Sequence, residues 1–375
     1  MEKSVKIIPV YLPQFHQIPE NDEWWGKGFT EWVNVRNAKP LFEGHNQPRV
    51  PLNNNYYDLS NIETLKWQCK LAREHGIYGF CMYHYWFNGH LLLQKPLETL
   101  LTHPEIDINY CISWANHDWT DGWKANNRPK ILISHDFNDE QDWVSHFNYM
   151  LPFFKDKRYM KMNGKPIMVI YAPHLILKLN KLLNKWTQLA KEAGLDGLTY
   201  ISQSAASTYN RHWDRSLIDY EVEMQPQYIN YVTNAGAETV YPLLMKYSRR
   251  IKKFFGIKRS LAFSLKKKST LARLDYDACW EQIISRHPFS DKMIPCAFTD
   301  WDNTPRYKEK GYLYDGVTPA KFKCYLLKLI EKAKKEYPTD MIFLFAWNEW
   351  AEGGYLEPDE LYGYGFLEAI KECME

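Results

Sequence analysis

Two glutamates near the C-terminus have the residue type and the spacing that glycosidic chemistry requires. Glu349 and Glu352 lie three residues apart in the stretch AWNEWAEGGYLEPD, residues 346–359. On a straight strand such a pair points to opposite faces, but where a strand breaks into a helical turn both side chains reach one side. Two carboxyl groups walled by indole rings can hold different pKa values, so that one acts as acid and the other as base. The alternative is a solvated turn with buried tryptophans.

An apolar run at residues 341–346 precedes the pair and has the length and composition of a buried strand. Gly353 and Gly354 follow the pair, and glycine allows the chain to turn sharply there. The sequence therefore predicts two carboxylates at the end of a strand.

The rest of the chain alternates between strand-like and helix-like segments. The predicted strands cover residues 5–12, 77–85, 109–114, 167–171, 198–204, 220–227, 293–299 and 341–346. The predicted helices cover residues 60–76, 96–101, 138–154, 175–193, 318–337 and 359–373. Repeated βα units form a parallel sheet, and eight of them favour a (β/α)8 TIM barrel over an open doubly wound sheet. We predict an α/β fold with a single catalytic barrel over residues 1–375.

Two helix starts and one loop carry more specific signals. Ser60 is predicted to cap the first helix, with Glu63 at the third position, and Thr318 to cap the helix over 318–337. Residues 17–58 are predicted to form a long polar and aromatic loop, and loops of such length in compact domains are usually functional.

In such a barrel the chemistry lies at the C-terminal ends of the strands, and polar or aromatic residues follow nearly every predicted strand. We predict catalytic roles for Glu349 and Glu352. The predicted substrate-binding residues are Tyr11, Gln14, His16, Trp32, Tyr83, His84, Trp86, Trp114, Asn116, Gln203, Glu223, Gln225, Asp302, Arg306, Trp347, Asn348 and Trp350. For His16 and His84 an ordinary structural role is the alternative.

The composition favours a carbohydrate ligand and argues against nucleic acid. Aromatic residues make up 16% of the chain, and rings with a polar edge suit ligands that offer both C–H faces and hydroxyls. A formal net charge of +2 argues against a nucleic-acid-binding surface. The seven cysteines include no CxxC pair, which indicates a reducing compartment. With neither a signal peptide nor an apolar run long enough to cross a membrane, the prediction is a cytoplasmic protein.

A basic insertion interrupts the barrel pattern between the sixth and seventh strands, at residues 229–276. Residues 246–273 contain 11 Lys and Arg and no acidic residue, so the rest of the chain carries more acidic than basic residues. Apolar residues are interleaved with these charges, and residues 243–273 could therefore lie on an anionic membrane, peripheral to the inner membrane. The alternative is a solvated insertion. No oligomeric state is predicted.

No metal or organic cofactor is predicted. The chain has no HExxH motif, no CxxC motif, no acidic calcium loop and no glycine-rich phosphate loop. Asp300-Trp301-Asp302 has the D-x-D form with which nucleotide-sugar glycosyltransferases hold a divalent cation. It follows a predicted barrel strand instead of a nucleotide-binding βαβ unit, which weakens that interpretation.

Five stretches together resemble a known family. They are residues 11–35 (YLPQFHQIPENDEWWGKGFTEWVNV), 39–52 (KPLFEGHNQPRVPL), 79–89 (GFCMYHYWFNG), 300–306 (DWDNTPR) and 346–359. They resemble the WbsX family of polysaccharide-locus proteins, usually labelled glycosyltransferase, which is similar in turn to glycoside hydrolase family 99, the endo-α-mannosidases. The resemblance spans nearly the whole chain outside the basic insertion. It implies a (β/α)8 barrel that acts on glycans without a cofactor.

The resemblance also implies unequal roles for the two glutamates. Glu349 would deprotonate the 2-hydroxyl of the substrate, whose oxygen would attack the anomeric carbon through an epoxide-like intermediate. Glu352 would protonate the leaving oxygen and then activate water or an acceptor hydroxyl. The chain departs from the family at His117, where many members have an acidic residue, and at residues 121–128, which are less rich in arginine.

Three functions remain open from the sequence. The first is retaining cleavage or transfer of glycosidic bonds in a bacterial polysaccharide, mannan-like or O-antigen-like, in an open cleft. The second is a glycosyltransferase that uses a nucleotide-sugar or lipid-linked donor in O-antigen or capsule assembly. The third is a catalytically silent barrel that binds glycans.

Overall fold

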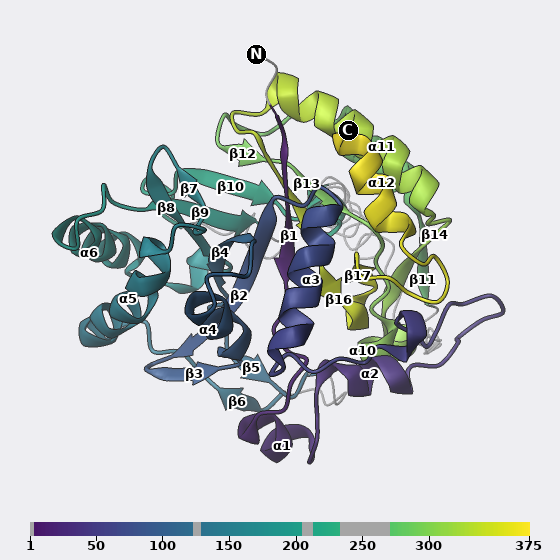
Figure 1. The fold of residues 1–375 in the computed structure, drawn as a ribbon, viewed down its shortest axis with the longest axis horizontal. Helices are drawn as coiled ribbons and strands as arrows, with labels where there is room; N and C mark the ends of the chain where they lie inside the picture. The colour runs from purple at the N-terminus through teal and green to yellow at the C-terminus, as the bar shows by residue number, and fades with distance from the viewer. Residues whose placement is uncertain (1–3, 123–128, 205–212, 233–270) are drawn as a thin grey trace, which may run out of the picture.

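The computed structural model describes residues 4–122, 129–204, 213–232 and 271–375 (Figure 1). Most of the predicted basic insertion, including residues 243–270 of the predicted membrane-binding segment, lies outside these ranges. The insertion, its membrane contact and the single-domain boundaries therefore stay predictions.

A parallel sheet of nine strands forms the centre of the molecule (Figure 1). Its order is β12 (Met293–Ile294), β10 (Tyr220–Glu223), β9 (Thr199–Ser204), β8 (Lys165–Ile170), β4 (Asn109–Trp114), β2 (Gly79–Phe87), β1 (Lys6–Tyr11), β15 (Met341–Phe345) and β13 (Cys296–Phe298). Each neighbouring pair along this order is parallel. All nine residues of β2 are buried, as expected for a sheet covered on both faces.

The two ends of this sheet meet. Only Pro295 separates β12 from β13, and proline lacks the N–H group that a continuous ladder would need. One extended segment therefore pairs with β10 on one side and with β15 on the other, so the sheet is a nearly closed barrel. The predicted (β/α)8 fold is confirmed, with the seventh predicted strand split in two.

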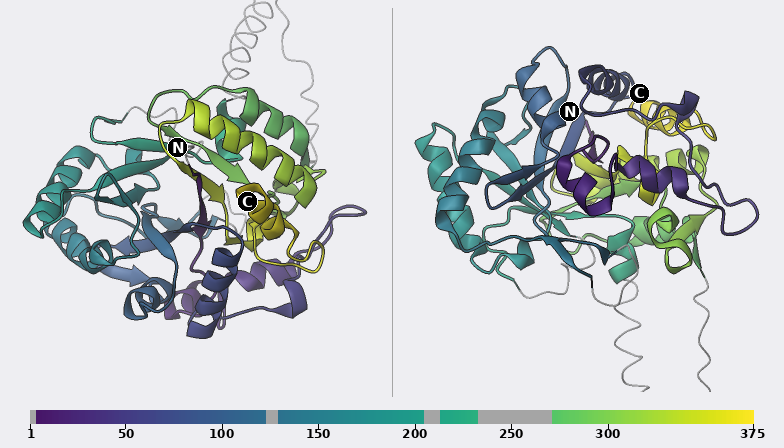
Figure 2. Two further views of the ribbon diagram at one scale, coloured as in Figure 1. Left: turned by 45° about the horizontal axis from the view of Figure 1, so that its top comes forward. Right: turned by 90° about the horizontal axis from the view of Figure 1, so that it is seen from below.

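Helices surround the barrel (Figure 2). They are α3 (Ile62–Glu74), α4 (Lys95–Thr102), α5 (Glu140–Lys155), α6 (Leu179–Glu192), α9 (Tyr276–Ser285), α11 (Pro319–Glu336) and α12 (Gly365–Met374). On α11 the buried residues include Phe322, Leu326 and Leu329, which recur at helical spacing and face the core. Within the described residues, no helix combines the length and the apolarity that crossing a bilayer demands.

Some predicted details need correction. Thr318 caps α11 as predicted, but the cap of α3 is Asn61, whose side chain accepts a hydrogen bond from the backbone of Glu63. Helix α9 was not predicted, and α12 begins at Gly365, six residues later than predicted. Asp359 instead forms isolated bridges with Pro51 and Gly363.

The predicted long loop contains helices of its own. These are α1 (Pro19–Trp25), α2 (Glu31–Asn37) and the short η1 (Leu52–Asn54). The remaining short elements are β3 (His90–Leu92), β5 (Trp119–Thr120), β6 (Ile131–Ile133), β7 (Lys161–Met162), η3 (Pro173–Leu175), β11 (Ala272–Asp275), α10 (Thr304–Tyr307), η4 (Lys308–Lys310), β14 (Tyr312–Asp315), β16 (Asn348–Glu349), η5 (Trp350–Glu352) and β17 (Gly354–Tyr355).

Candidate active site

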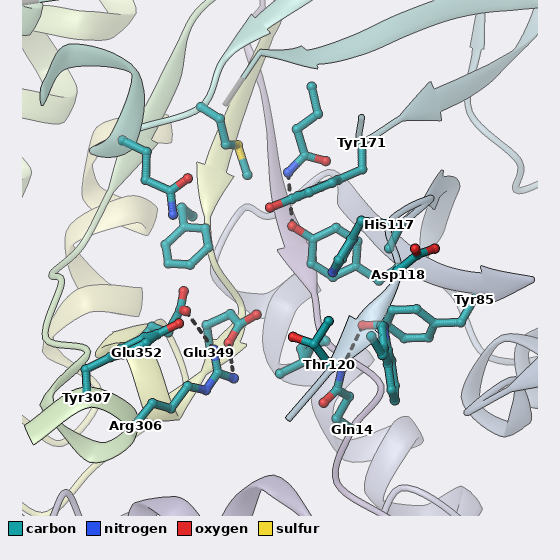
Figure 3. Close-up of a pocket in the computed structure, with 18 of the residues that line it drawn as sticks. Gln14, Tyr85, His117, Asp118, Thr120, Tyr171, Arg306, Tyr307, Glu349 and Glu352 are labelled. Carbon is teal, nitrogen blue, oxygen red and sulfur yellow. Dashed lines mark hydrogen bonds and ion pairs between the residues drawn. The ribbon is translucent and has the colours of Figure 1, made fainter. Parts of the chain in front are cut away.

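A cavity of about 410 Å³ opens at the C-terminal ends of the barrel strands (Figure 3). Residues that follow or end β1, β2, β4, β8, β9, β10 and β15 line it, together with residues of α1, α10 and η5. This is the end of the barrel at which (β/α)8 enzymes carry out their chemistry.

The two glutamates reach the cavity through a tight turn after β15. Glu349 ends β16, Glu352 ends η5, and both line the cavity. Gly353 follows with a φ of 73°, in the left-handed region that glycine tolerates. Gly354 then pairs with Glu349 across the β16–β17 ladder. The predicted strand, break and turn therefore bring both carboxylates to the same cavity.

Arg306 connects both glutamates to a third carboxylate. Its Nη1 lies 2.6 Å from Glu352 Oε1, and its Nη2 lies 3.5 Å from Glu349 Oε2 (Figure 3). The same Nη2 lies 3.0 Å from Glu31 Oε2. Glu31 comes from α2 and is completely buried. One guanidinium thus faces three carboxylates, so if all of them ionise the cluster carries excess negative charge.

This arrangement shifts the pKa of both cavity glutamates upward. For Glu349, burial raises the pKa well above its usual value; Arg306 opposes this shift, and Glu352 and Glu31 add to it. For Glu352, burial again raises the pKa, against the opposing effect of Arg306. The cavity therefore stabilises the protonated form of each carboxyl relative to water, and a general acid must carry its proton before it reacts.

Hydrogen-bonded aromatic and amide groups form the facing wall. Gln203 donates to the hydroxyl of Tyr83 at 3.0 Å, and Gln14 donates to the hydroxyl of Tyr85 at 2.9 Å. Tyr171, which directly follows β8, also lines the cavity, and burial raises its pKa to about 12. Phenol rings beside amides can contact both the apolar faces and the hydroxyls of a sugar.

The structure brings seven of the predicted site residues together at this cavity. They are Gln14, Tyr83, Gln203, Gln225, Arg306, Glu349 and Glu352. The other twelve do not line it.

Strand alternation explains four of these twelve. Tyr83 and Tyr85 face the cavity, so His84 and Trp86 point outward, where they contact His146 and Asp142 of α5. By the same rule, Glu223 on β10 points outward and accepts a hydrogen bond from Tyr337; burial raises its pKa to about 7. Trp114 packs against His146 and Trp186 of the surrounding helices.

Six others lie in a layer behind the glutamates. Asn348 accepts from the backbone N–H of Leu12 at 2.8 Å and donates to its carbonyl at 3.0 Å, which ties the turn to the end of β1. Trp350 donates to Glu357, and Trp347 packs on Phe80. Trp32 packs on Trp350, and Tyr11 and His16 are buried without lining the cavity. These side chains support the site instead of lining it.

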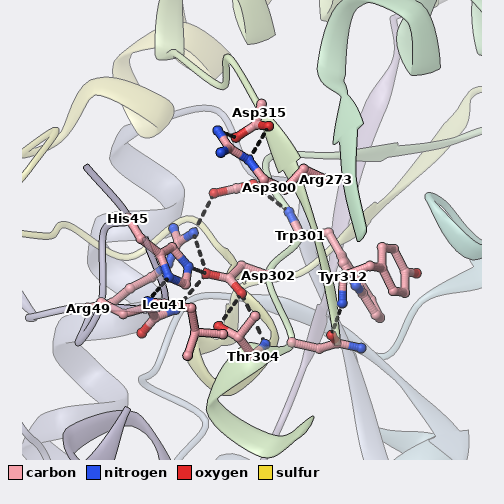
Figure 4. A network of polar contacts seen from close by, with 12 residues as sticks. Leu41, His45, Arg49, Arg273, Asp300, Trp301, Asp302, Thr304, Tyr312 and Asp315 are labelled. Atoms are coloured by element: carbon pink, nitrogen blue, oxygen red, sulfur yellow. Dashed lines mark hydrogen bonds and ion pairs between the residues drawn. The ribbon is translucent and has the colours of Figure 1, made fainter. Parts of the chain in front are cut away.

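The last two are also held by protein atoms. Asn116 bonds to both backbone polar groups of Ala172. Asp302 accepts hydrogen bonds from His45, Gln47 and Thr304, and its neighbour Asp300 pairs with Arg49 at 2.7 Å (Figure 4). The described residues contain no cluster of three or more His, Cys, Asp or Glu suited to a metal ion.

Several cavity residues were not predicted as site residues. Tyr85 and Asp118 come at the ends of the second and third predicted strands and Tyr171 at the end of the fourth, but none of the three was among the predicted substrate-binding residues. His117 lines the cavity at the position where the chain departs from the family, and burial lowers its pKa. Nothing in the sequence indicated Glu31, because it follows no predicted strand and is linked to the site only by its ion pair with Arg306.

A nearly closed (β/α)8 barrel with buried, arginine-bridged carboxylates at its C-terminal end defines the structural class. The model of the family described as glycosyltransferase WbsX matches residues 7–370, so the chain belongs to the WbsX family. It is 29% identical, over 379 residues, to an uncharacterized protein WxcX of Xanthomonas campestris pv. campestris, strain B100, and equally to that of a second strain. The matches cover 98% of this chain and 49% of each relative, so the chain spans about half the length of these curated relatives.

Two solved structures share the fold at low sequence identity. One, described as a glycoside hydrolase-like protein, has a TM-score of 0.58 at 13% identity, covering 100% of this chain and 94% of the other. The second, an endo-α-mannosidase of glycoside hydrolase family 99 from Bacteroides thetaiotaomicron, has a TM-score of 0.54 at 12% identity, covering 98% and 96%. The description of the family, glycosyltransferase, is that of carbohydrate-active enzymes.

Proposed function

We propose that this chain cleaves or transfers glycosidic bonds with retention of configuration, acting on a mannan-like or O-antigen-like bacterial polysaccharide. The observation that carries the proposal is the pair of glutamates, buried Glu349 and half-buried Glu352, which line one cavity and share Arg306. Two carboxyl groups flanking the scissile bond are the usual requirement of glycoside hydrolysis.

The roles of the two glutamates follow from the resemblance to glycoside hydrolase family 99. Glu349 takes the proton of the substrate's 2-hydroxyl, and that oxygen attacks the anomeric carbon to give an epoxide-like intermediate. Glu352 gives its proton to the leaving oxygen as its bond to the anomeric carbon breaks. Water or an acceptor hydroxyl, which loses its proton to Glu352, then attacks the anomeric carbon and opens the epoxide, and Glu349 returns its proton to the 2-oxygen. The raised pKa of Glu352 supports its part as the acid. Burial raises the pKa of Glu349 as well, and Arg306 only opposes that shift, so the role of Glu349 as the base rests on the resemblance alone.

A glycan fits the lining of the cavity. Tyr83, Tyr85, Tyr171 and Trp119 offer ring surfaces, and Gln203 offers an amide among them. Aromatic rings stack on the C–H faces of sugars, while amides select hydroxyl positions.

A sugar transferase that uses an activated donor is the second candidate, and the family description favours it. Such enzymes commonly hold a divalent cation between the two carboxylates of a D-x-D motif. Here Asp302 accepts four hydrogen bonds from protein groups, and Asp300 pairs with Arg49. The D-x-D carboxylates are thus already engaged, which favours the first candidate.

The test is incubation of the purified protein with α-mannan and O-antigen oligosaccharides, followed by mass spectrometry. One arm contains no nucleotide sugar, and the other contains nucleotide sugars with Mn²⁺. Products without donor that are absent in Glu349→Gln support a hydrolase or transglycosylase. Products that need the donor identify a transferase, and binding without any turnover identifies a glycan-binding barrel.

A further inference from the structure

We propose that Asp302 is a positioning residue that fixes both Glu352 and Arg306, and that His45 and Gln47 hold it in place. The proposal rests on the function proposed above. The four residues His45, Gln47, Asp302 and Thr304 are called the Asp302 network below (Figure 4).

Hydrogen bonds from the protein fill the acceptor capacity of the Asp302 carboxylate. Its Oδ2 accepts from His45 Nε2 at 2.9 Å and from Gln47 Nε2 at 2.7 Å. Its Oδ1 accepts from the backbone N–H of Thr304 at 3.0 Å and from the Thr304 hydroxyl at 2.6 Å. A carboxylate offers about four lone-pair sites, and these four bonds use them. Although burial alone would raise the pKa of Asp302, its hydrogen-bond donors and Arg49 lower it, so the group stays ionised.

The tautomer of His45 is fixed for this task. The backbone N–H of Leu41 donates to His45 Nδ1 at 3.1 Å, so that nitrogen carries no proton. The proton of the neutral ring therefore lies on Nε2, which donates to Asp302. His45, in the stretch 39–52, thus donates a hydrogen bond to the carboxylate of Asp302, more than 250 positions later in the sequence.

From this fixed carboxylate, two contacts lead to the reacting groups. The backbone N–H of Asp302 donates to the carbonyl of Glu352 at 2.7 Å, which fixes the main chain of the proposed acid. The bonds to Thr304 begin α10, and two residues later that helix carries Arg306, which contacts Glu352 and Glu349. Asp302 therefore sets the positions of the proposed acid and of the cation that tunes both glutamates.

The glycine turn closes tightly on this network. A Cβ atom at Gly353 would lie 2.7 Å from the backbone nitrogen of Asp302 and 3.3 Å from Arg49 Nη2. Arg49 in turn pairs with Asp300 at 2.7 Å. Because all these contacts are buried, a shift of Asp302 passes to Glu352 instead of being absorbed by solvent.

Asp302→Asn tests the proposal, because it keeps the shape but replaces one acceptor oxygen with a donor. In one orientation the new amide N–H₂ meets the donors of His45 and Gln47, and in the other it meets the backbone N–H of Thr304. We expect kcat to fall about 10- to 100-fold with KM within about threefold, since a misplaced acid costs rate more than binding. We also expect a displaced pH profile of kcat, which a merely structural role would not produce. Gln47→Ala, which removes a single donor, should show a smaller loss in the same direction.

Asp315→Asn is the matched control. Asp315 forms an exposed ion pair with Arg273 close to the network but makes no contact with Asp302 (Figure 4). Its kcat, KM and pH profile should equal those of the unchanged protein.

A crystal structure of Asp302→Asn separates the failure of this proposal from the failure of the proposed function. If the unchanged protein turns over no glycan, the proposed function fails, while a displaced Arg306 and Glu352 in the variant still support the positioning role. An unmoved Arg306 and Glu352, or an unchanged kcat and pH profile, would overturn it. Mn²⁺ binding by the unchanged protein that Asp302→Asn abolishes would overturn it as well, by making Asp302 a metal ligand.

Discussion

Arg306 is the residue on which the charge balance of the cavity depends. It contacts Glu31, Glu349 and Glu352, and its own charge is what keeps three neighbouring carboxylates compatible. Glu31 lies on α2 and, unlike Glu349 and Glu352, does not line the cavity, so it can be changed without removing a proposed reacting group.

Glu31→Gln should lower the pKa of both cavity glutamates. Glu31 raises each of these pKa values through its negative charge, and the neutral amide removes that effect. The limbs of the pH profile of kcat/KM should therefore move to lower pH. A steady-state pH series checks this, and limbs that stay in place or move to higher pH would contradict the assigned charge coupling.

Glu352→Gln should lower kcat while leaving glycan binding nearly intact. The amide keeps the shape but cannot donate a carboxylic proton, and general acid catalysis typically contributes about 10²- to 10⁴-fold. Single-turnover rates and calorimetric titration with the same oligosaccharide separate the two effects. An unchanged rate would remove Glu352 from the mechanism.

The residue types at the site could be predicted from the sequence, but their orientations could be predicted only in part. Glu349, Glu352 and Arg306 follow predicted strands and do meet at the cavity. Both Tyr83 and His84 were predicted to bind substrate, yet only Tyr83 faces the cavity. Successive residues of a strand point to opposite faces. Because every residue of β2 is buried, its sequence does not show which of the two faces points into the cavity.

Among the elements, the strands and the crossover helices other than α9 were predictable, whereas α1 and α2 were not. Buried strands and amphipathic helices carry their own periodic signals. Helices α1 and α2 have seven residues each, and no side-chain cap hydrogen bond begins either one. So short a helix is marginal alone, and α2 is stabilised by packing, as where Trp32 contacts Trp350 of η5. Residues 17–58 therefore resembled a loop.

Gly353→Ala should weaken both the turn and the site. The glycine has a φ of 73°, and a Cβ there would lie 2.7 Å from the backbone nitrogen of Asp302. We expect a loss of about 1–3 kcal/mol in the free energy of unfolding. We also expect a lower kcat, because the added Cβ would push against Asp302 and distort the hydrogen bond from its backbone N–H to the Glu352 carbonyl. Urea unfolding and steady-state kinetics check this.

Gly89→Ala provides a comparison for that variant. It lies at another glycine with positive φ, 85°, but a Cβ there would have no atom within 4 Å. It should cost stability without affecting kcat. A Gly353→Ala variant that keeps full activity would contradict the coupling of the turn to the site.

At the scale of the whole molecule, buried histidines outside the cavity link stability to pH. His84 and His146 lie 2.9 Å apart between β2 and α5, and burial lowers the pKa of His84 to about 3. In the unfolded chain His84 binds a proton as pH falls below about 6.5, whereas in the folded protein it stays neutral at that pH. The contribution of His84 to stability is therefore lost as pH falls below about 6.5.

His84→Gln should therefore gain stability relative to the unchanged protein as pH falls. Between pH 8 and pH 5 the difference in the free energy of unfolding should change by about 2 kcal/mol in favour of the variant. Denaturant unfolding of both proteins at several pH values checks this, because contributions common to both cancel. A difference that does not vary with pH would show that His84 does not stay neutral in the folded state.

The barrel as a whole explains why residues distant in the sequence form one site. Parallel strands place their C-terminal ends at the same end of the barrel, so Gln14, Tyr83, Gln203 and Glu349 meet there. The break at Pro295 was missed by treating residues 293–299 as one strand, although a proline inside an apolar run is itself a signal for an interrupted strand.

Retaining cleavage by the Glu349–Glu352 pair can be tested by time-resolved proton NMR of an α-linked manno-oligosaccharide with the protein and no sugar donor. We expect new anomeric signals that appear first in the α configuration, from the unchanged protein and not from Glu349→Gln. Signals that appear only after a nucleotide sugar is added, or that appear first in the β configuration, would contradict retaining cleavage by the Glu349–Glu352 pair.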